Sequence, residues 1–247
     1  MSIKQRDSLK MARYVLWFVF VAGSLAIEDL GGKVFLFPKA TDTARVILKP
    51  MITKRVESVT VCLESYTALT RGHSLFSLAM PGMDNALLIF PKPPNRYEFI
   101  LSQESSFFQV NPEVLDWKHT CVSWESELGV VQLWIDGKLY PRTVMKKKSQ
   151  IDIEASIILG QEQDSYRGKF DIQQCFVGEI TNVHMWDYVL TQEEIQKVLA
   201  GKKDMNGNII NWRSLQYEIK GDVVVQPQLQ CRSLGNNYNL HSMCYEN

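Results

Sequence analysis

The sequence of 247 residues lacks the charge patterns and motifs that identify several common classes of protein. Lys and Arg together number 27, as do Asp and Glu, so the formal net charge is zero. No basic stripe or acidic tail indicates specific nucleic-acid readout or another polyanionic partner. The four histidines show no zinc spacing, and neither an EF-hand pattern nor an N-x-[ST] sequon occurs. Any charge that matters for function must therefore be local.

Long apolar runs are scarce as well, and the one near the N-terminus predicts export. Four bases precede an apolar stretch at residues 14–25, which is shorter than the roughly 20 residues that a membrane helix needs. Ser24 and Ala26 then occupy the −3 and −1 positions of a cleavage site. Residues 1–26 are therefore predicted to be a secretory signal peptide, with a signal anchor as the alternative. We expect the mature protein outside the cell.

Helical periodicity is almost absent, which argues against a helical bundle. Short β-rich runs alternate with turn residues instead, and this series predicts an all-β protein. The expected strands span residues 34–37, 46–48, 58–63, 75–79, 86–90, 97–101, 120–124, 130–135, 157–160, 178–186 and 223–225. Many short strands joined by polar turns indicate a lectin-like jelly-roll β-sandwich of two antiparallel sheets.

One short helix is predicted near the C-terminus. Thr191 and Glu194 have the spacing of a capping box, in which each side chain accepts a hydrogen bond from the other residue's backbone N–H. Apolar residues follow on one face, and Gly201 supplies the stop. We expect this helix to cover one face of a sheet in a single domain of residues 27–229. A cysteine-containing tail at 230–247 follows the domain.

Cysteine is rare but informative, because thiols of an exported chain can form disulfides. Cys62 and Cys121 lie in two β-rich apolar stretches. A bridge between them would close a loop of about 60 residues and contribute about 4 kcal/mol in the chain-entropy model. Cys175, Cys231 and Cys244 remain. Three cysteines cannot all pair within one chain, so one is a free thiol or forms a bond between subunits.

Oxygen-bearing side chains concentrate in two segments that lie far apart in the sequence. Both segments combine carboxylates with amides, the hard oxygen ligands that calcium prefers. These residues are Asp84, Asn85, Glu162, Gln163, Asp164, Asp171 and Gln174. Four carboxylates would balance two calcium ions, whose outer faces would attract an anionic oxygen. From spacing alone, solvated loops remain an open interpretation, as does a jelly-roll glycoside hydrolase that uses the paired acids Glu162 and Asp164.

Four motifs resemble the pentraxin family. Residues 119–126 read HTCVSWES, which matches the family signature H-x-C-x-[ST]-W-x-[ST]. The stretches 156–165 (SIILGQEQDS), 35–39 (FLFPK) and 208–212 (NIINW) are also similar to family sequences. The resemblance covers residues 33–229 without large gaps, and it implies the same sandwich fold.

The resemblance also implies two calcium ions per subunit. The family's first ion would be held here by Asp84, Asn85, Glu162, the Gln163 carbonyl and Asp164. The second ion would be held by Glu162, Asp164, Asp171 and Gln174. The family disulfide falls on Cys62 and Cys121.

An apolar ligand pocket is implied at Phe90 and Ile100, where family members take the choline methyl groups of phosphocholine. An ordinary core position is the other interpretation of Phe90. Ile100 is bulky for a pocket, and packed surfaces resist added volume, so ethanolamine headgroups or carbohydrate should fit better. The acid that contacts the ligand nitrogen is not assigned, because Ser105 aligns with it while Glu104 is adjacent.

The expected function is calcium-dependent pattern recognition by a secreted, acute-phase type protein of innate immunity that is not an enzyme. Its partners would be phosphorylated headgroups or carbohydrate on microbial or damaged-cell surfaces. Relatives form cyclic pentamers, in which five weak sites on one face bind an arrayed surface tightly. Complement contact has weak support, because Leu199 replaces a tyrosine of the family although Asp136 matches. A disulfide-linked extracellular matrix protein or jelly-type structural lectin is the alternative.

Overall fold

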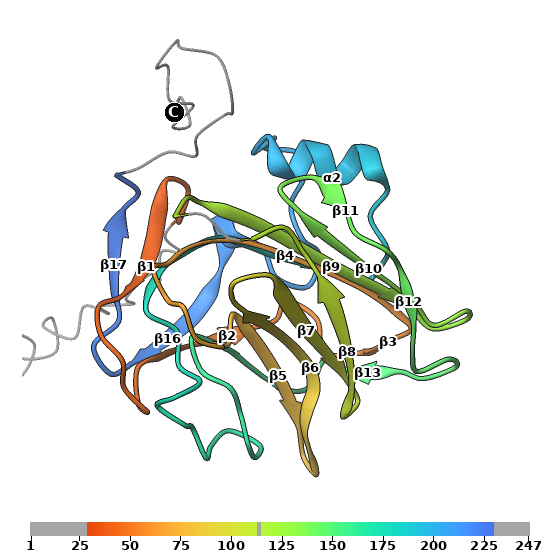
Figure 1. The fold of residues 1–247 in the computed structure, drawn as a ribbon, viewed down its shortest axis with the longest axis horizontal. Coiled ribbons are helices and arrows are strands. Elements are labelled where there is room, and N and C mark those ends of the chain that lie inside the picture. The colour runs from red at the N-terminus through yellow and green to blue at the C-terminus, as the bar shows by residue number, and fades with distance from the viewer. Residues whose placement is uncertain (1–28, 113–114, 230–247) are drawn as a thin grey trace, which may run out of the picture.

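The computed structural model describes residues 29–112 and 115–229. Two large antiparallel sheets enclose one main hydrophobic core (Figure 1), so the predicted β-sandwich is confirmed. The predicted signal peptide and the C-terminal tail lie outside the described residues. In the part of the chain that is described, no helix has the length and apolar character that crossing a membrane requires.

The larger sheet contains eight strands and the disulfide. In spatial order the strands are β11 (Lys138–Leu139), β10 (Val130–Ile135), β9 (Lys118–Glu125), β4 (Ser58–Tyr66), β15 (Gly178–Trp186), β1 (Lys33–Phe37) and β17 (Val224–Pro227), and β12 (Thr143–Val144) also pairs with β10. Cys62 and Cys121 lie opposite each other in the β4–β9 register and are joined by a disulfide. The pairing implied by the family resemblance is therefore confirmed.

The second sheet contains seven strands and positions the candidate site. The strands are β16 (Gln216–Lys220), β2 (Arg45–Lys49), β14 (Ser156–Leu159), β5 (Phe76–Met80), β6 (Met83–Lys92), β7 (Arg96–Leu101) and β8 (Glu104–Gln109), while β3 (Arg55–Val56) and β13 (Ile151–Asp152) form a separate pair. Leu87 and Ile89 of β6 belong to the main core. Because alternate strand residues face opposite sides, Leu88 and Phe90 lie on the outer face of this sheet.

Every run that was expected to be a strand overlaps an observed one. The two-residue strands β3, β11, β12 and β13 were not expected, and neither were the longer strands β8 and β16. These two strands form the opposite edges of the seven-stranded sheet. The strand expected at 223–225 begins one residue later, as β17.

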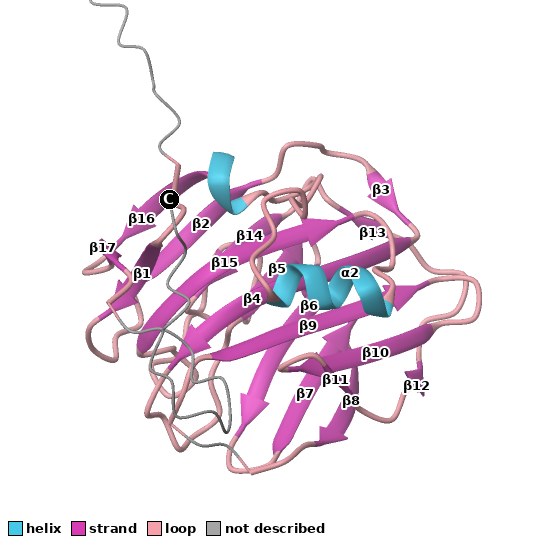
Figure 2. Ribbon diagram, turned by 90° about the horizontal axis from the view of Figure 1, so that it is seen from above, coloured by secondary structure: helices cyan, strands magenta, loops and turns pink. Residues whose placement is uncertain are grey.

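Helix α2 (Gln192–Leu199) covers the outer face of the eight-stranded sheet, as Figure 1 and Figure 2 show. Both halves of the predicted capping box are present. The backbone N–H of Glu194 donates to Thr191 Oγ1 at 3.3 Å, and that of Thr191 donates to Glu194 Oε2 at 2.7 Å. Ile195 and Val198 pack in one hydrophobic cluster with the disulfide. The helix and the disulfide thus stabilise the sheet that does not carry the candidate site.

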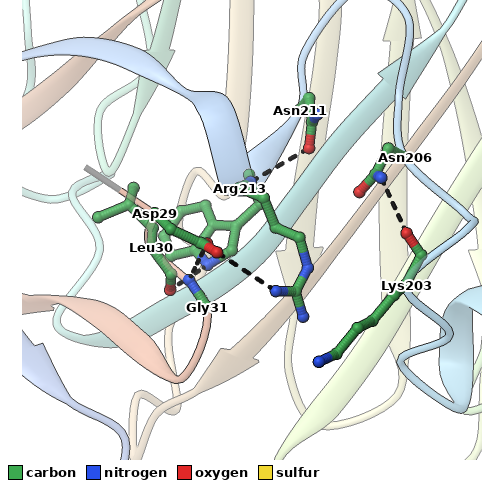
Figure 3. A network of polar contacts seen from close by, with 8 residues as sticks. Asp29, Leu30, Gly31, Lys203, Asn206, Asn211 and Arg213 are labelled. Atoms are coloured by element: carbon green, nitrogen blue, oxygen red, sulfur yellow. Dashed lines mark hydrogen bonds and ion pairs between the residues drawn. The ribbon is translucent and has the colours of Figure 1, made fainter. Parts of the chain in front are cut away.

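Polar contacts join the first described residues to a segment near the end of the domain (Figure 3). The 3-10 helix η2 (Trp212–Ser214) lies against the segment that precedes β1. Trp212 Nε1 donates to the Leu30 carbonyl oxygen at 2.8 Å, and Arg213 Nη1 lies 3.4 Å from Asp29 Oδ2. The N-terminal segment of the domain is therefore held by its C-terminal part.

Candidate metal site

The first two candidate ligands lie at an irregularity in the seven-stranded sheet. Asp84 and Asn85 are near the start of β6, where the pairing of β6 with β5 shifts register. Such bulges re-aim the side chains that they contain. The neighbouring β7–β8 turn supports this irregularity, because Gln103 N donates to the Asn85 carbonyl oxygen at 2.9 Å and Gln103 Nε2 donates to Asp84 Oδ1 at 2.9 Å.

The segment that follows β14 folds back over the same sheet. Gly160 has a φ of +85°, a left-handed conformation that glycine adopts without strain. Gln163 then anchors the segment, because its Nε2 donates to the carbonyl oxygens of Ser77 at 3.2 Å and Ser156 at 3.1 Å. Its Oε1 accepts a hydrogen bond from Arg167 N at 3.1 Å. The Gln163 side chain is thus committed to the protein, which leaves its carbonyl oxygen as the atom to consider as a metal ligand.

This reversal brings the two segments of candidate ligands together. Asn85 Nδ2 lies 3.4 Å from Glu162 Oε1, although 77 positions separate the two residues in the sequence. Glu162 is only 7% exposed. In Figure 1 the β5–β6 hairpin projects away from α2, so this site and the helix lie on opposite sides of the sandwich.

The carboxylates of the cluster act on one another electrostatically. Burial raises the pKa of Glu162 to about 7, and the negative charge of Asp164 adds to the effect. Burial also raises the pKa of Asp164, helped by the charges of Asp84 and Asp171. Asp164 is therefore close enough to Asp84, Glu162 and Asp171 for their negative charges to oppose one another at Asp164 when ionised. A bound divalent cation would relieve this repulsion.

Two amide oxygens in the cluster are buried without a hydrogen-bond partner. Within the described residues, Asn85 Oδ1 and Gln174 Oε1 accept no hydrogen bond. Buried polar atoms are normally satisfied, because leaving one unpaired costs about 1–3 kcal/mol. Both atoms are hard oxygen donors of the kind that calcium binds. The chemistry of the donor set therefore fits calcium.

Arg71 holds the loop that carries Asp171 and Gln174, a role that no motif in the sequence indicates. Its Nη1 donates to the carbonyl oxygens of Gln173 and Cys175, each at 2.8 Å. Its Nη2 lies 3.3 Å from the sulfur of Cys175, which is a fully buried free thiol. Cys175 is thus shielded from a bond between subunits, while Cys231 and Cys244 lie outside the described residues.

The two residues expected to form an apolar pocket lie on the outer face of the same sheet. Phe90 and Ile100 occupy neighbouring rows of the β6–β7 pair, since Leu88 is opposite Ile100 and Phe90 is opposite Glu98. Phe90 is only 6% exposed and lies outside the main core cluster. Its ring is therefore covered from the outside.

The two positions considered for an acid beside the ligand nitrogen point in different directions. Ser105 of β8 is opposite Ile100 and so shares its face of the sheet. Glu104 is one residue away and forms an ion pair with Lys146 at 3.5 Å. The nearest acid in the Phe90 row is instead Glu98, which the sequence did not single out.

Known proteins support the assignment suggested by the four motifs. The sequence model of the family described as "Pentaxin family" matches residues 33–227. C-reactive protein of Xenopus laevis is 59% identical over 238 residues, which cover 96% of this chain and all of the relative. C-reactive protein of Homo sapiens is 45% identical and covers 81% of this chain, with 90% of its own length matched.

The fold has a counterpart among solved structures. The native heptameric SAP-like pentraxin from Limulus polyphemus superposes with a TM-score of 0.71 at 21% identity, over 83% of this chain and 98% of that one. The fold, the signature motifs and the match over nearly all of the described domain agree, and the chain belongs to the pentraxin family.

Proposed function

We propose that this pentraxin is a secreted protein that binds phosphate-bearing headgroups, of the phosphocholine or phosphoethanolamine type, or carbohydrate through a pair of calcium ions. The ligands of the pair would be Asp84, Asn85, Glu162, the Gln163 carbonyl, Asp164, Asp171 and Gln174. The observation that carries the proposal is the convergence of these acids and amides from two distant segments, with two buried amide oxygens left unpaired.

Hydrogen bonds within the chain would position the metal-coordinating side chains before an ion binds. The Asn85–Glu162 contact orients one amide, and Gln103 positions Asp84. Arg71 holds the loop that bears Asp171 and Gln174. The ions would supply positive charge at the surface, where an anionic oxygen of the ligand can bind.

The assembly and location that we propose follow from the family resemblance and the sequence. A signal peptide at 1–26 would place the chain in an oxidising compartment, which suits the Cys62–Cys121 disulfide. A cyclic pentamer would present five sites on one face and bind arrayed ligands by avidity. Pentraxins of the C-reactive protein type are recognition proteins, and we extend this non-enzymatic role to the present chain.

A chelation experiment tests the proposed function. The protein should bind agarose that carries phosphoethanolamine or phosphocholine in millimolar calcium, and excess EDTA should release it. Agarose blocked with ethanolamine alone is the control and should retain little protein. Retention on the phosphate resin in excess chelator would refute the calcium-dependent mechanism.

Calcium affinity should also depend on pH. The folded, metal-free chain holds a proton on Glu162 with a pKa of about 7, above the ordinary value of 4.5. An ion must displace that proton, so the apparent calcium affinity should fall about tenfold for each pH unit below 7 and level off above it. Calcium titrations against a fluorescent indicator between pH 5.5 and 8.5 measure this slope. An affinity that does not change between pH 6 and pH 8 would show that calcium displaces no proton from Glu162 in this range.

A further inference from the structure

A lysine side chain lies across the surface beside the candidate metal site. Lys92 Nζ is 2.6 Å from Glu98 Oε2 and 5.7 Å from the centre of the Phe90 ring. The Glu98 side chain is only 12% exposed, so its carboxylate is largely removed from water. An aromatic face next to a shielded carboxylate is the arrangement by which proteins bind organic cations. Here that position holds a cation of the protein itself.

This arrangement lies within reach of whatever the metal site binds. Phe90 of β6 and Glu98 of β7 are direct neighbours across the β6–β7 pair, and Asp84 and Asn85 lie near the start of β6. Both Glu98 and Lys92 also act electrostatically on the Glu162 carboxylate. A ligand whose phosphate bound at the ions, and whose tail ran along β6, would meet Lys92.

The surface beyond Lys92 adds further positive charge. Lys92 Nζ lies 5.3 Å from the ring centre of Phe107, and Arg96 Cζ lies 4.5 Å from the same centre. Phe107 itself is 48% exposed on the edge strand β8. Two cations thus lie close to this ring, and such a surface repels an ammonium group and tolerates hydroxyl or anionic groups.

We propose that Lys92 is a tethered ammonium group that occupies the cation position formed by Phe90 and Glu98, and so makes the site bind phosphate esters with uncharged or anionic tails at least as well as esters with ammonium tails. An ammonium tail would have to displace Lys92 from its carboxylate. This inference rests on the proposed function, because it assumes that the phosphate binds at the ions. The inference concerns how the charge of a ligand's tail changes its affinity for that site.

The test compares two phosphate esters of similar size as inhibitors of calcium-dependent binding to the phosphate resin. Glycerol 2-phosphate has an uncharged tail, and phosphoethanolamine has an ammonium tail. The wild-type protein should bind glycerol 2-phosphate at least as well. Lys92→Met should shift the ratio of the two inhibition constants about tenfold toward phosphoethanolamine, since its ammonium can then reach Glu98. Lys92→Gln is a second variant for the case in which Lys92→Met folds poorly. It should shift the ratio in the same direction.

Two further variants separate this mechanism from a general change of charge. Arg96→Met removes a positive charge from the same surface but leaves the Lys92–Glu98 ion pair in place, so it should change the ratio less than twofold. In the double variant Lys92→Met/Glu98→Gln the shift should disappear. An equal shift in Arg96→Met, or no shift in either Lys92 variant while calcium-dependent binding persists, would overturn the inference alone. If the wild-type protein binds neither ester in calcium, the proposed function falls and the inference falls with it.

Discussion

Replacing Glu162 by glutamine should lower the calcium affinity by more than about 100-fold, because the lost carboxylate belongs to both proposed ion sites. The same substitution should stabilise the calcium-free protein. Burial and the charge of Asp164 raise the pKa of Glu162 to about 7, so the folded chain holds this proton more tightly than the unfolded chain does. Above pH 7 the ionised carboxylate therefore opposes folding by up to about 3 kcal/mol, and a neutral glutamine does not.

Thermal melting at pH 8 separates these two effects. A metal that binds only the folded chain raises its Tm, so the wild-type Tm should rise when calcium is added. The Glu162→Gln variant should start from a higher Tm and show little further rise. Glu154→Gln is the matched control, because Glu154 is an exposed carboxylate outside the cluster and should behave as the wild type does. A Glu162→Gln variant that calcium stabilises as much as the wild type would contradict the site.

Removing the disulfide by the double substitution Cys62→Ala/Cys121→Ala should lower the free energy of unfolding by on the order of 4 kcal/mol. The bridge joins residues 59 positions apart and restricts a long loop in the unfolded chain. It also packs under α2 with Ile195 and Val198, so the loss should loosen the helix. Urea unfolding, followed by circular dichroism, measures the change.

A single cysteine variant and a calcium titration serve as controls for this prediction. Cys175→Ala removes a buried thiol that closes no loop, so it should cost much less stability. The disulfide lies in the eight-stranded sheet and the candidate site on the other one, so folded protein without the bridge should keep its calcium affinity. A destabilisation below about 1 kcal/mol would show that the bridge adds little to this domain.

The central part of the fold could be predicted because its strands are buried and therefore apolar in sequence. The capping box at Thr191 marked the helix for a similar reason, since its two side chains act on neighbouring backbone groups. The edge strands β8 and β16 could not be found in this way. Both read as mixtures of polar and apolar residues, with many exposed positions, because an edge strand has little core to face.

The candidate site was only partly visible in the sequence. The concentration of carboxylates and amides in two segments pointed to Asp84, Glu162 and Asp164, and the family resemblance favoured calcium binding over solvated loops. Their approach in space depends on the register shift in β6 and on the reversal at Gly160, neither of which residue spacing encodes. Arg71, Gln103 and Lys92 were missed for a related reason. Each of them acts through a tertiary contact with a distant segment or an adjacent strand, and no local motif marks such contacts.

The paired calcium site is tested most directly by the anomalous scattering of calcium in crystals grown with that ion. We expect two anomalous peaks in each subunit, both in contact with Glu162 and Asp164, one of them also in contact with Asp84 and the other with Asp171. Crystals in which the Asp84 and Glu162 carboxylates face each other with no peak between them would contradict this expectation.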